Sequence, residues 1–465
     1  MPPQTRRQFV GNSFGVATAL ALRSDRAAVA TGPQDSAAVG ANIDLPRGRV
    51  PLSFIIDDST CLVNMGKFCM PQFAATYPQR AEYQKPWRDW PAEIPDAFVR
   101  KFGEWCAAHG VKGKYSVVPY PACVGWLDRL LPGWSHKELR DSLQLVRELM
   151  TPHWDIHPEM ITHTRVIDLK SGRPTNDFSP ASMENSYPQS AVSTDYLASY
   201  MAYALRILKN CELPCTGITT PGGFGNRVKE KLPVAVAEAV QDVFAAEIPH
   251  YFKYVVDTGW DTEPIIETLE PLRDDEIAPG KLPKFAVNIP AGTGDWFGGW
   301  DGTVESQPQR YASADATSGR LVELIEARRP ALMLCHWPGM YCHGTESGFR
   351  AFQAVVTALH SRFADQVLWM KLSEIARYWA ARFWSDVLAT EAGLRIVAPF
   401  SCPLFTVRID RTVRQVVLIT PDGASTTLQR VASLATLDQG QWFTDGKSSR
   451  ICWHLQQGVT ELLIQ

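Results

Sequence analysis

The sequence lacks several features that would decide its class at once. No apolar run reaches the ~20 residues that a membrane-spanning helix needs. None of the 10 cysteines forms a CxxC pair, the spacing of many cysteine zinc sites. Internal repeats and low-complexity segments are absent as well. The sequence therefore argues against a membrane span, a cysteine zinc site and a repeat protein.

Neither sign of charge dominates the chain. Its 465 residues carry a formal net charge of −3, and 45% of them are hydrophobic. Residues 1–30 hold four arginines and one aspartate, so their removal would make the charge −6. This composition is typical of a folded globular protein, and the acidic balance argues against nucleic acid as a main partner.

Residues 1–30 have the order of an export signal. Arg6 and Arg7 precede a modestly apolar run that ends near Leu22, and "AVA" at Ala28–Ala30 offers small residues for cleavage. This order is typical of a twin-arginine signal. We therefore expect a periplasmic or extracellular protein. Disulfides are permitted in those compartments, although cysteine spacing alone does not assign their partners.

Short apolar runs alternate with amphipathic segments between residues 50 and 388. The runs "LSFII", "KYSVV", "WDI" and "ALMLC" predict strands, and helical spacing follows most of them. One predicted helix begins with a capping box formed by Ser135 and Glu138. Alternation over this length predicts a parallel sheet, closed or nearly closed into a (β/α) barrel. The short β-type segments of residues 390–465 predict a separate small antiparallel β domain.

The strand "SFII" runs directly into two adjacent carboxylates, Asp57 and Asp58. Two like charges at one strand end repel each other unless a cation or a shared proton offsets the repulsion. One carboxylate could then bind a metal while the other stays free as a base. The alternative is a solvated pair that begins a turn.

Two further clusters follow predicted strands. The stretch "HWDIHPEMITHT" holds the pairs His153/His157 and Glu159/His163, each spaced i, i+4. On one helical turn, such a pair would set two ligands on a divalent metal. His336 ends the apolar run "ALMLCH", a position that suits a general acid.

The order of these pieces resembles the polysaccharide deacetylase family, or NodB-homology domain, over about residues 50–385. "SFIIDD", "DIHPEMITH" and "LMLCH" are similar to its first, second and last motifs. The resemblance implies a distorted parallel (β/α) barrel. It also implies a catalytic base at Asp57, a catalytic acid at His336, and the metal ligands Asp58, Glu159 and His163. Zinc is the first expectation for the metal, with manganese or magnesium as alternatives.

The sequence departs from the family pattern at two places. Glu159 stands where the family has histidine, so His157 remains an additional or alternative ligand and the His153/His157 register stays open. Thr219, in "TTPGG", stands where the family has an arginine that orients the catalytic aspartate. The family's orienting arginine is therefore missing from this sequence.

Aromatic residues near these motifs suggest a carbohydrate ligand. The glycine-rich "TGDWFGGWDG" carries Trp296 and Trp300, and Trp337 follows His336. Their rings could stack on sugar faces or could seal the loop onto the barrel. We expect these three residues and Pro221 to contact substrate.

We therefore expect a metal-dependent hydrolase acting on carbohydrate, first a polysaccharide or oligosaccharide deacetylase. A glycoside hydrolase of the same fold is one alternative. A non-catalytic, exported carbohydrate-binding protein is the other.

Overall fold

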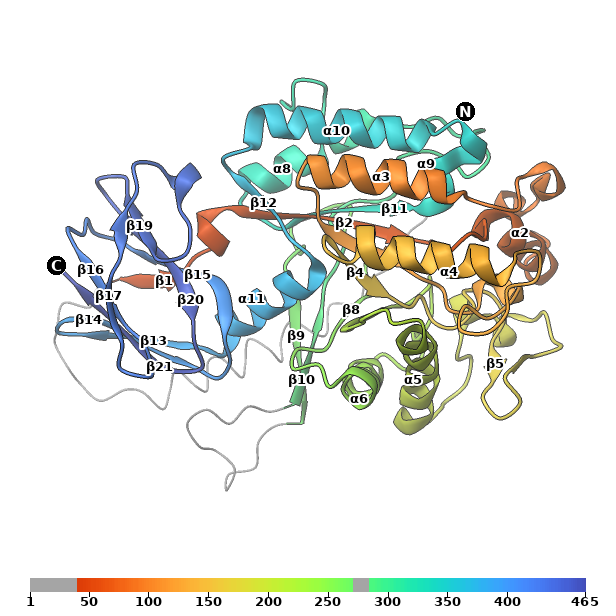
Figure 1. Cartoon of the computed structure of the whole chain (residues 1–465), viewed down its shortest axis with the longest axis horizontal. Helices are drawn as coiled ribbons and strands as arrows, with labels where there is room; N and C mark the ends of the chain where they lie inside the picture. The colour runs from red at the N-terminus through yellow and green to blue at the C-terminus, as the bar shows by residue number, and fades with distance from the viewer. Residues whose placement is uncertain (1–39, 271–283) are drawn as a thin grey trace.

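The computed structural model describes residues 40–270 and 284–465. The predicted export signal, residues 1–30, lies outside the described residues. The described chain is a mixed α/β protein in which helices flank the sheets on one side of the molecule and two β-rich layers lie at the other (Figure 1).

A parallel sheet holds most of the predicted strands. Its order is β11-β2-β3-β4, with β12 also paired to β2, and every pair is parallel. The strands are β2 (Val50–Asp57), β3 (Gly113–Ser116), β4 (Trp154–His157), β11 (Ala331–His336) and β12 (Val367–Trp369). Every residue of β2 is buried, which explains why its sequence is nearly continuous in apolar residues.

A second sheet has the order β7-β8-β10-β9, in which only β9 is antiparallel to its neighbour. Its strands are β7 (Gly217–Thr219), β8 (His250–Phe252), β9 (Ile265–Glu270) and β10 (Lys284–Asn288). An isolated parallel bridge between Glu159 and Thr219 links the two sheets. At another edge, Gly292 N donates to Leu332 O at 2.8 Å. No closed barrel is formed by the strand ladders of the described residues.

Helices cover both sheets. In Figure 1, α3, α4 and α10 lie beside the first, parallel sheet, and α5 and α6 lie beside the second sheet. The longer helices are α2 (Met65–Thr76), α3 (Asp96–Ala108), α4 (His136–Leu145), α5 (Thr194–Asn210), α6 (Leu232–Phe244), α8 (Arg320–Glu326), α10 (Ser347–Phe363) and α11 (Leu372–Trp384); α7 (Pro308–Tyr311) and α9 (Trp337–Tyr341) are short. The predicted capping box of Ser135 and Glu138 is present at the start of α4.

Two further sheets, largely antiparallel, contain the C-terminal strands. One has the order β13-β14-β21-β16-β17, with bounds Asp386–Thr390, Gly393–Ala398, Gly458–Ile464, Val416–Ile419 and Ser425–Thr427. The other has the order β1-β15-β20-β19-β18, with bounds Ala41–Ile43, Cys402–Ile409, Ser449–Leu455, Gln441–Thr444 and Gln429–Arg430. Strand β1 therefore joins the C-terminal strands, although it precedes the α/β part in the chain.

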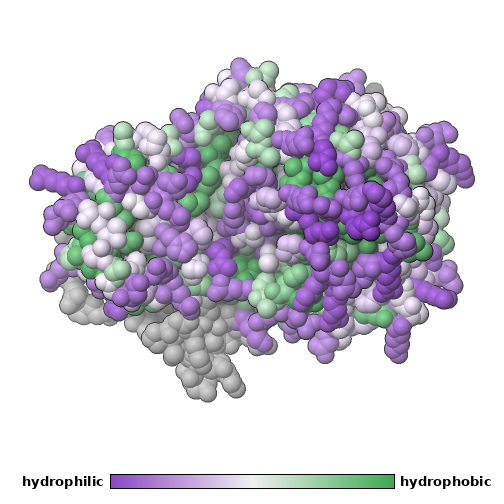
Figure 2. All heavy atoms as spheres, viewed as in Figure 1, coloured by the Kyte–Doolittle hydropathy of each residue, from purple (hydrophilic) through white to green (hydrophobic). Residues whose placement is uncertain are grey.

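The surface and the cysteines complete the picture. Polar residues dominate the face drawn in Figure 2, where apolar residues show as small separate areas. All ten cysteines are free thiols, including the neighbours in sequence Cys211 and Cys215. Among the helices of the described residues, none has the length and apolar character needed to cross a bilayer.

Candidate active site

Three groups predicted from separate motifs lie at one edge of the parallel sheet. Asp57 ends β2, and His336 ends β11 directly beside it in the strand register. Strand β4 ends at His157, two residues before Glu159. Because the carboxyl ends of parallel strands share an edge, residues far apart in sequence meet there.

Asp58, Glu159 and His163 form a buried group that could hold a metal ion, since their ligand atoms lie within 4.8 Å of one another. Asp58 Oδ1 is 2.9 Å from His163 Nε2, and His163 Nδ1 is 3.3 Å from Glu159 Oε1. Neither Asp58 Oδ1 nor His163 Nδ1 has a hydrogen-bond partner of good geometry in the described structure. Two carboxylates and one imidazole that are all buried and converge in this way are a donor set that fits a bound divalent cation.

The loop that carries His163 is not the helical turn that the i, i+4 spacing predicted. Residues 160–164 form bends, and His163 has a φ of 65°. The cause is Glu184, a buried carboxylate that accepts hydrogen bonds from the backbone N–H groups of Ile161, Thr162 and His163. The hydroxyl of Tyr200 also donates to it. Glu184 thus fixes the loop, and nothing in the motif itself pointed to a residue 21 positions further along the chain.

Asp57 has a buried lysine as its counter-charge. Lys114 Nζ donates to Asp57 Oδ1, to Ile56 O at 2.9 Å and to Ser116 Oγ at 2.8 Å. Lys114 comes from β3 and is fully buried. Sequence reasoning missed this residue because "KYSVV" was interpreted only as a strand; a charged residue inside an apolar run was the available signal.

His336 is oriented by Asp295. The Asp295 Oδ2 atom lies 2.8 Å from His336 Nδ1 and accepts from His336 N at 3.0 Å. This arrangement leaves Nε2 as the free ring nitrogen. Asp295 lies in the glycine-rich stretch 293–302, which was singled out for its tryptophans rather than for its aspartate.

The ionisable groups at this edge of the sheet shift one another's pKa values. Burial raises the pKa of Asp57 to about 6, although the Lys114 ammonium opposes the shift. Burial also acts to raise the pKa of Glu159, but the adjacent His163 outweighs it and lowers that pKa to about 2. The pKa of His336 is raised to about 10 despite burial, because Asp295, Asp58 and Asp57 favour the imidazolium. The edge therefore combines a carboxylate that titrates near neutrality with a histidine that keeps its proton.

The predicted aromatic contacts divide between the site and the core. Trp300 has its ring 6.1 Å from that of His336, which puts it beside the candidate acid. Trp296 is half-buried and packs on Tyr311 with Arg310 over its ring. Trp337 is 1% exposed and packs against Phe98, Phe102 and Tyr115, so it belongs to the core and not to an open binding surface. Pro221 is buried in the turn after β7.

The other histidines of the second motif do not join the metal-compatible group. His157 turns its ring towards His250, with 3.1 Å between the two Nε2 atoms. His153 lies before β4, on the strand's opposite end from Glu159. The structure thus groups Glu159 and His163, and not His153 and His157, with Asp58.

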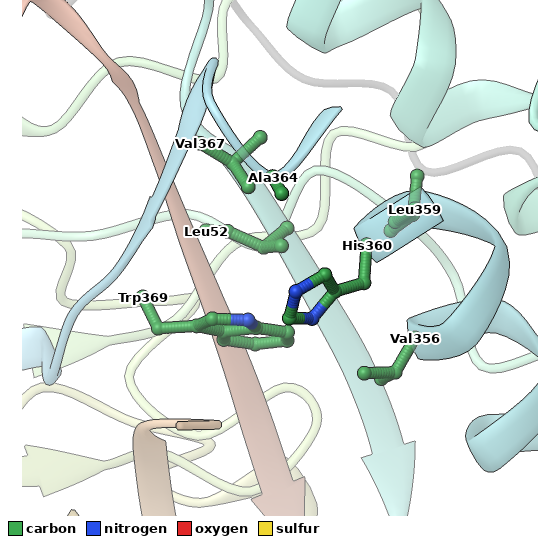
Figure 3. Close-up of a pocket in the computed structure, with 7 residues that line it drawn as sticks. All are labelled: Leu52, Val356, Leu359, His360, Ala364, Val367 and Trp369. Carbon is green, nitrogen blue, oxygen red and sulfur yellow. The ribbon is translucent and has the colours of Figure 1, made fainter. Parts of the chain in front are cut away.

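A small apolar pocket lies elsewhere, between α10 and the β2–β12 pair. Its volume is about 70 Å³, and Figure 3 shows the seven residues around it: Leu52, Val356, Leu359, His360, Ala364, Val367 and Trp369. It contains none of the strand-end groups described above.

Comparison with known proteins adds no relative. The chain matches no model of a known protein family, and a search of curated proteins finds no match.

Proposed function

We propose that the protein is a metal-dependent hydrolase acting on carbohydrate, in the first place a deacetylase of polysaccharides or oligosaccharides. The observation that carries this proposal is the strand-end arrangement. A metal-compatible triad, a buried carboxylate with a lysine partner, and an aspartate-oriented histidine occupy one edge of a parallel sheet. These groups can supply the Lewis acid, the general base and the general acid of a metal-assisted acyl hydrolysis.

Asp58, Glu159 and His163 would hold the cation, with zinc, manganese and magnesium all compatible with two carboxylates and one imidazole. When bound, such an ion supplies Lewis acidity towards a carbonyl oxygen and acidifies water. The positions of Asp58 Oδ1 and His163 Nδ1, buried and without good hydrogen bonds, support this assignment.

The chain's own groups would move the protons. Asp57 is adjacent to a proposed ligand and is paired with Lys114, so its carboxylate can accept the proton of the attacking water. His336 keeps its Nδ1 on Asp295 and can donate from Nε2 to the leaving amine or alkoxide. Each proton-transfer role of this kind typically contributes ~10²–10⁴-fold to the rate.

Lys114 compensates for the arginine that the family pattern has at the position of Thr219. In the family that the sequence resembles, an arginine orients the catalytic aspartate, and Thr219 stands in its place here. Lys114 supplies a cation to Asp57 from a different strand. The loss at Thr219 therefore does not leave Asp57 without a partner, and it does not argue against deacetylation.

We also propose membership of the polysaccharide deacetylase family, with a distorted barrel built from the two central sheets. The Glu159–Thr219 bridge and the hydrogen bond from Gly292 to Leu332 support that arrangement, because each joins one sheet to the other. The export signal expected over residues 1–30 fits a substrate outside the cytoplasm.

The test compares two neighbouring substitutions. We expect Asp58→Asn to lose the metal ion of the strand-end group and, with it, acetate release from acetylated oligosaccharides, because an amide is a poor ligand. We expect Asp57→Asn to keep the metal, measured by elemental analysis, and to lose at least ~10²-fold in turnover. Full turnover by Asp57→Asn, or release of new reducing ends without acetate, would contradict the proposal; the second result would indicate a glycoside hydrolase.

A further inference from the structure

A second group of metal-ligating residues lies inside the α/β part, separate from the strand-end site. Asp155 and His157 occupy the same face of β4, since they are two residues apart on a strand. His250 begins β8. One ligand atom from each of the three residues lies within 4.8 Å of the others, and both histidines are fully buried.

The outer nitrogen of each imidazole already has a neighbour. His157 Nδ1 is 3.4 Å from Thr219 Oγ1, and His250 Nδ1 is 3.4 Å from Ile248 O. Because a carbonyl oxygen only accepts, this contact favours the tautomer of His250 that has its proton on Nδ1 and a lone pair at Nε2. That Nε2 faces the Nε2 of His157 at 3.1 Å. In protein metal sites, the distal nitrogen is typically held by such a partner while the other nitrogen binds the ion.

The carboxylate of Asp155 is also oriented by hydrogen bonds. Asp155 Oδ2 accepts from Ser373 N at 2.6 Å, and Asp155 Oδ1 accepts from Ser373 Oγ at 2.8 Å. Ser373 lies in the first turn of α11. These two bonds orient the carboxylate and leave lone pairs on both oxygens, as is common for ligating carboxylates.

Gly217 makes room for the histidine pair. A Cβ atom at this position of β7 would lie 2.4 Å from His157 Nε2 and 2.5 Å from His250 Nε2. A side chain there would displace both nitrogens. The absence of a side chain at Gly217 therefore allows the two imidazoles to converge.

A cavity borders the carboxylate of Asp155. Asp155 lines a cavity of about 440 Å³, whose walls include Thr216, Ser373 and Arg377 from the α/β part and Cys402 and Leu404 from β15. This cavity lies between the α/β part and the C-terminal strands. It could admit an ion and supply water as a fourth ligand.

We propose that Asp155, His157 and His250 form a second binding site for a divalent cation of the zinc class. Two imidazole nitrogens and one carboxylate oxygen are a known donor set for zinc. This site shares no ligand with the strand-end group, so it does not depend on the proposed hydrolase function. Its place between β4, β8 and α11 suits an ion that ties the two central sheets together.

The test is the metal content of the chelator-stripped, full-length protein after equilibration with Zn²⁺, measured per chain by elemental analysis. We expect two equivalents in the unmodified chain, one in Asp58→Asn and one in His250→Gln. We expect none when both substitutions are combined. Asp155→Asn is a milder variant that can still accept a hydrogen bond from Ser373, and it should weaken the second equivalent. His360→Gln, an exposed histidine on α10, is the matched control and should keep both equivalents.

Metal contents are compared among variants that circular dichroism shows to be folded. If the unmodified chain binds one equivalent that Asp58→Asn abolishes, the second site is refuted and the strand-end site stands. If it binds one equivalent that only His250→Gln and Asp155→Asn abolish, the second site stands and the strand-end assignment fails. Two equivalents in His250→Gln and Asp155→Asn would also refute the second site.

Discussion

Lys114 and Asp57 form a buried ion pair in which each charge depends on the other. Removing only the lysine leaves a buried carboxylate without its cation, which typically costs ~3–5 kcal/mol. We expect Lys114→Met to lower the free energy of unfolding by about that amount in urea denaturation. We expect the double variant Asp57→Asn with Lys114→Met to be more stable than Lys114→Met alone. Equal stability of Lys114→Met and the unmodified chain would show that the pair is not coupled.

Glu184 acts on the metal-compatible group through the backbone. Its two oxygens accept N–H bonds from three successive residues, ending at His163. In Glu184→Gln one oxygen becomes an NH₂ group, which cannot accept these bonds. We expect the zinc affinity of the group formed by Asp58, Glu159 and His163 to fall ~10–100-fold, the usual effect of losing an outer-shell partner. The measurement is competition with a chelator, and Tyr200→Phe, which removes a single donor to Glu184, should have a smaller effect.

At the residue scale, the sequence predicted the groups whose motifs end a strand. Asp57, Asp58 and His336 could be found because a carboxylate or imidazole after a buried apolar run is conspicuous. Their partners Lys114, Glu184 and Asp295 could not be identified as partners. They lie on other strands or loops, and only the folded chain brings them within hydrogen-bond distance.

At the scale of elements, the close contact of β2 and β3 depends on Gly113. A Cβ at this position would lie 2.0 Å from Phe54 O, a backbone atom that cannot move aside. We expect Gly113→Ala to cost about 3 kcal/mol or more in unfolding free energy, because the strands must separate. The separation would also draw the neighbouring Lys114 away from Asp57.

Gly110→Ala is the matched control for this prediction. Nothing lies within 4 Å of its Cβ position, so only its left-handed φ of 66° opposes the substitution. That conformation costs about 1 kcal/mol for a non-glycine residue. If the two variants have equal stability, the close approach at Gly113 is not a constraint.

The helical periodicity of the sequence was misleading at the C-terminal end of α11. The helical pattern of residues 372–389 predicts one helix, but α11 ends at Trp384 and Asp386–Thr390 pairs with β14. Pairing with a strand outweighs the local preference of these residues. Strands β8 and β9 lie in a region without a clear pattern, and β8 has only three residues. Such short segments are specified by their neighbours in the sheet and not by their own sequence.

At the scale of the whole molecule, Asp44 ties the α/β part to the C-terminal strands. Its two oxygens each lie 2.7 Å from an arginine, Arg328 after α8 and Arg450 on β20. Its carbonyl also accepts from Tyr378 of α11 at 2.8 Å. The short β-type segments of residues 390–465 predicted the C-terminal strands. The contacts of Asp44 with Arg328, Arg450 and Tyr378 could not be predicted. They involve a residue that precedes the whole α/β part in sequence.

The Asp44 contact should make stability depend on pH in the acid range. Burial acts to raise the pKa of Asp44, but Arg328, the Leu45 N–H and Arg450 together hold it below its ordinary value. A carboxylate whose pKa is lower in the folded chain stabilises the fold fully above its unfolded pKa of about 3.9, and this stabilisation is lost as the pH falls below that value. We expect Asp44→Asn to be less stable by ~1–3 kcal/mol at pH 7 in urea denaturation, and the difference to shrink towards pH 3. Asp410→Asn removes an exposed partner of Arg408 and should change stability by less than ~1 kcal/mol. A difference between Asp44→Asn and the unmodified chain that stays constant from pH 7 to pH 3 would mean that the ionised Asp44 carboxylate does not hold the two parts together.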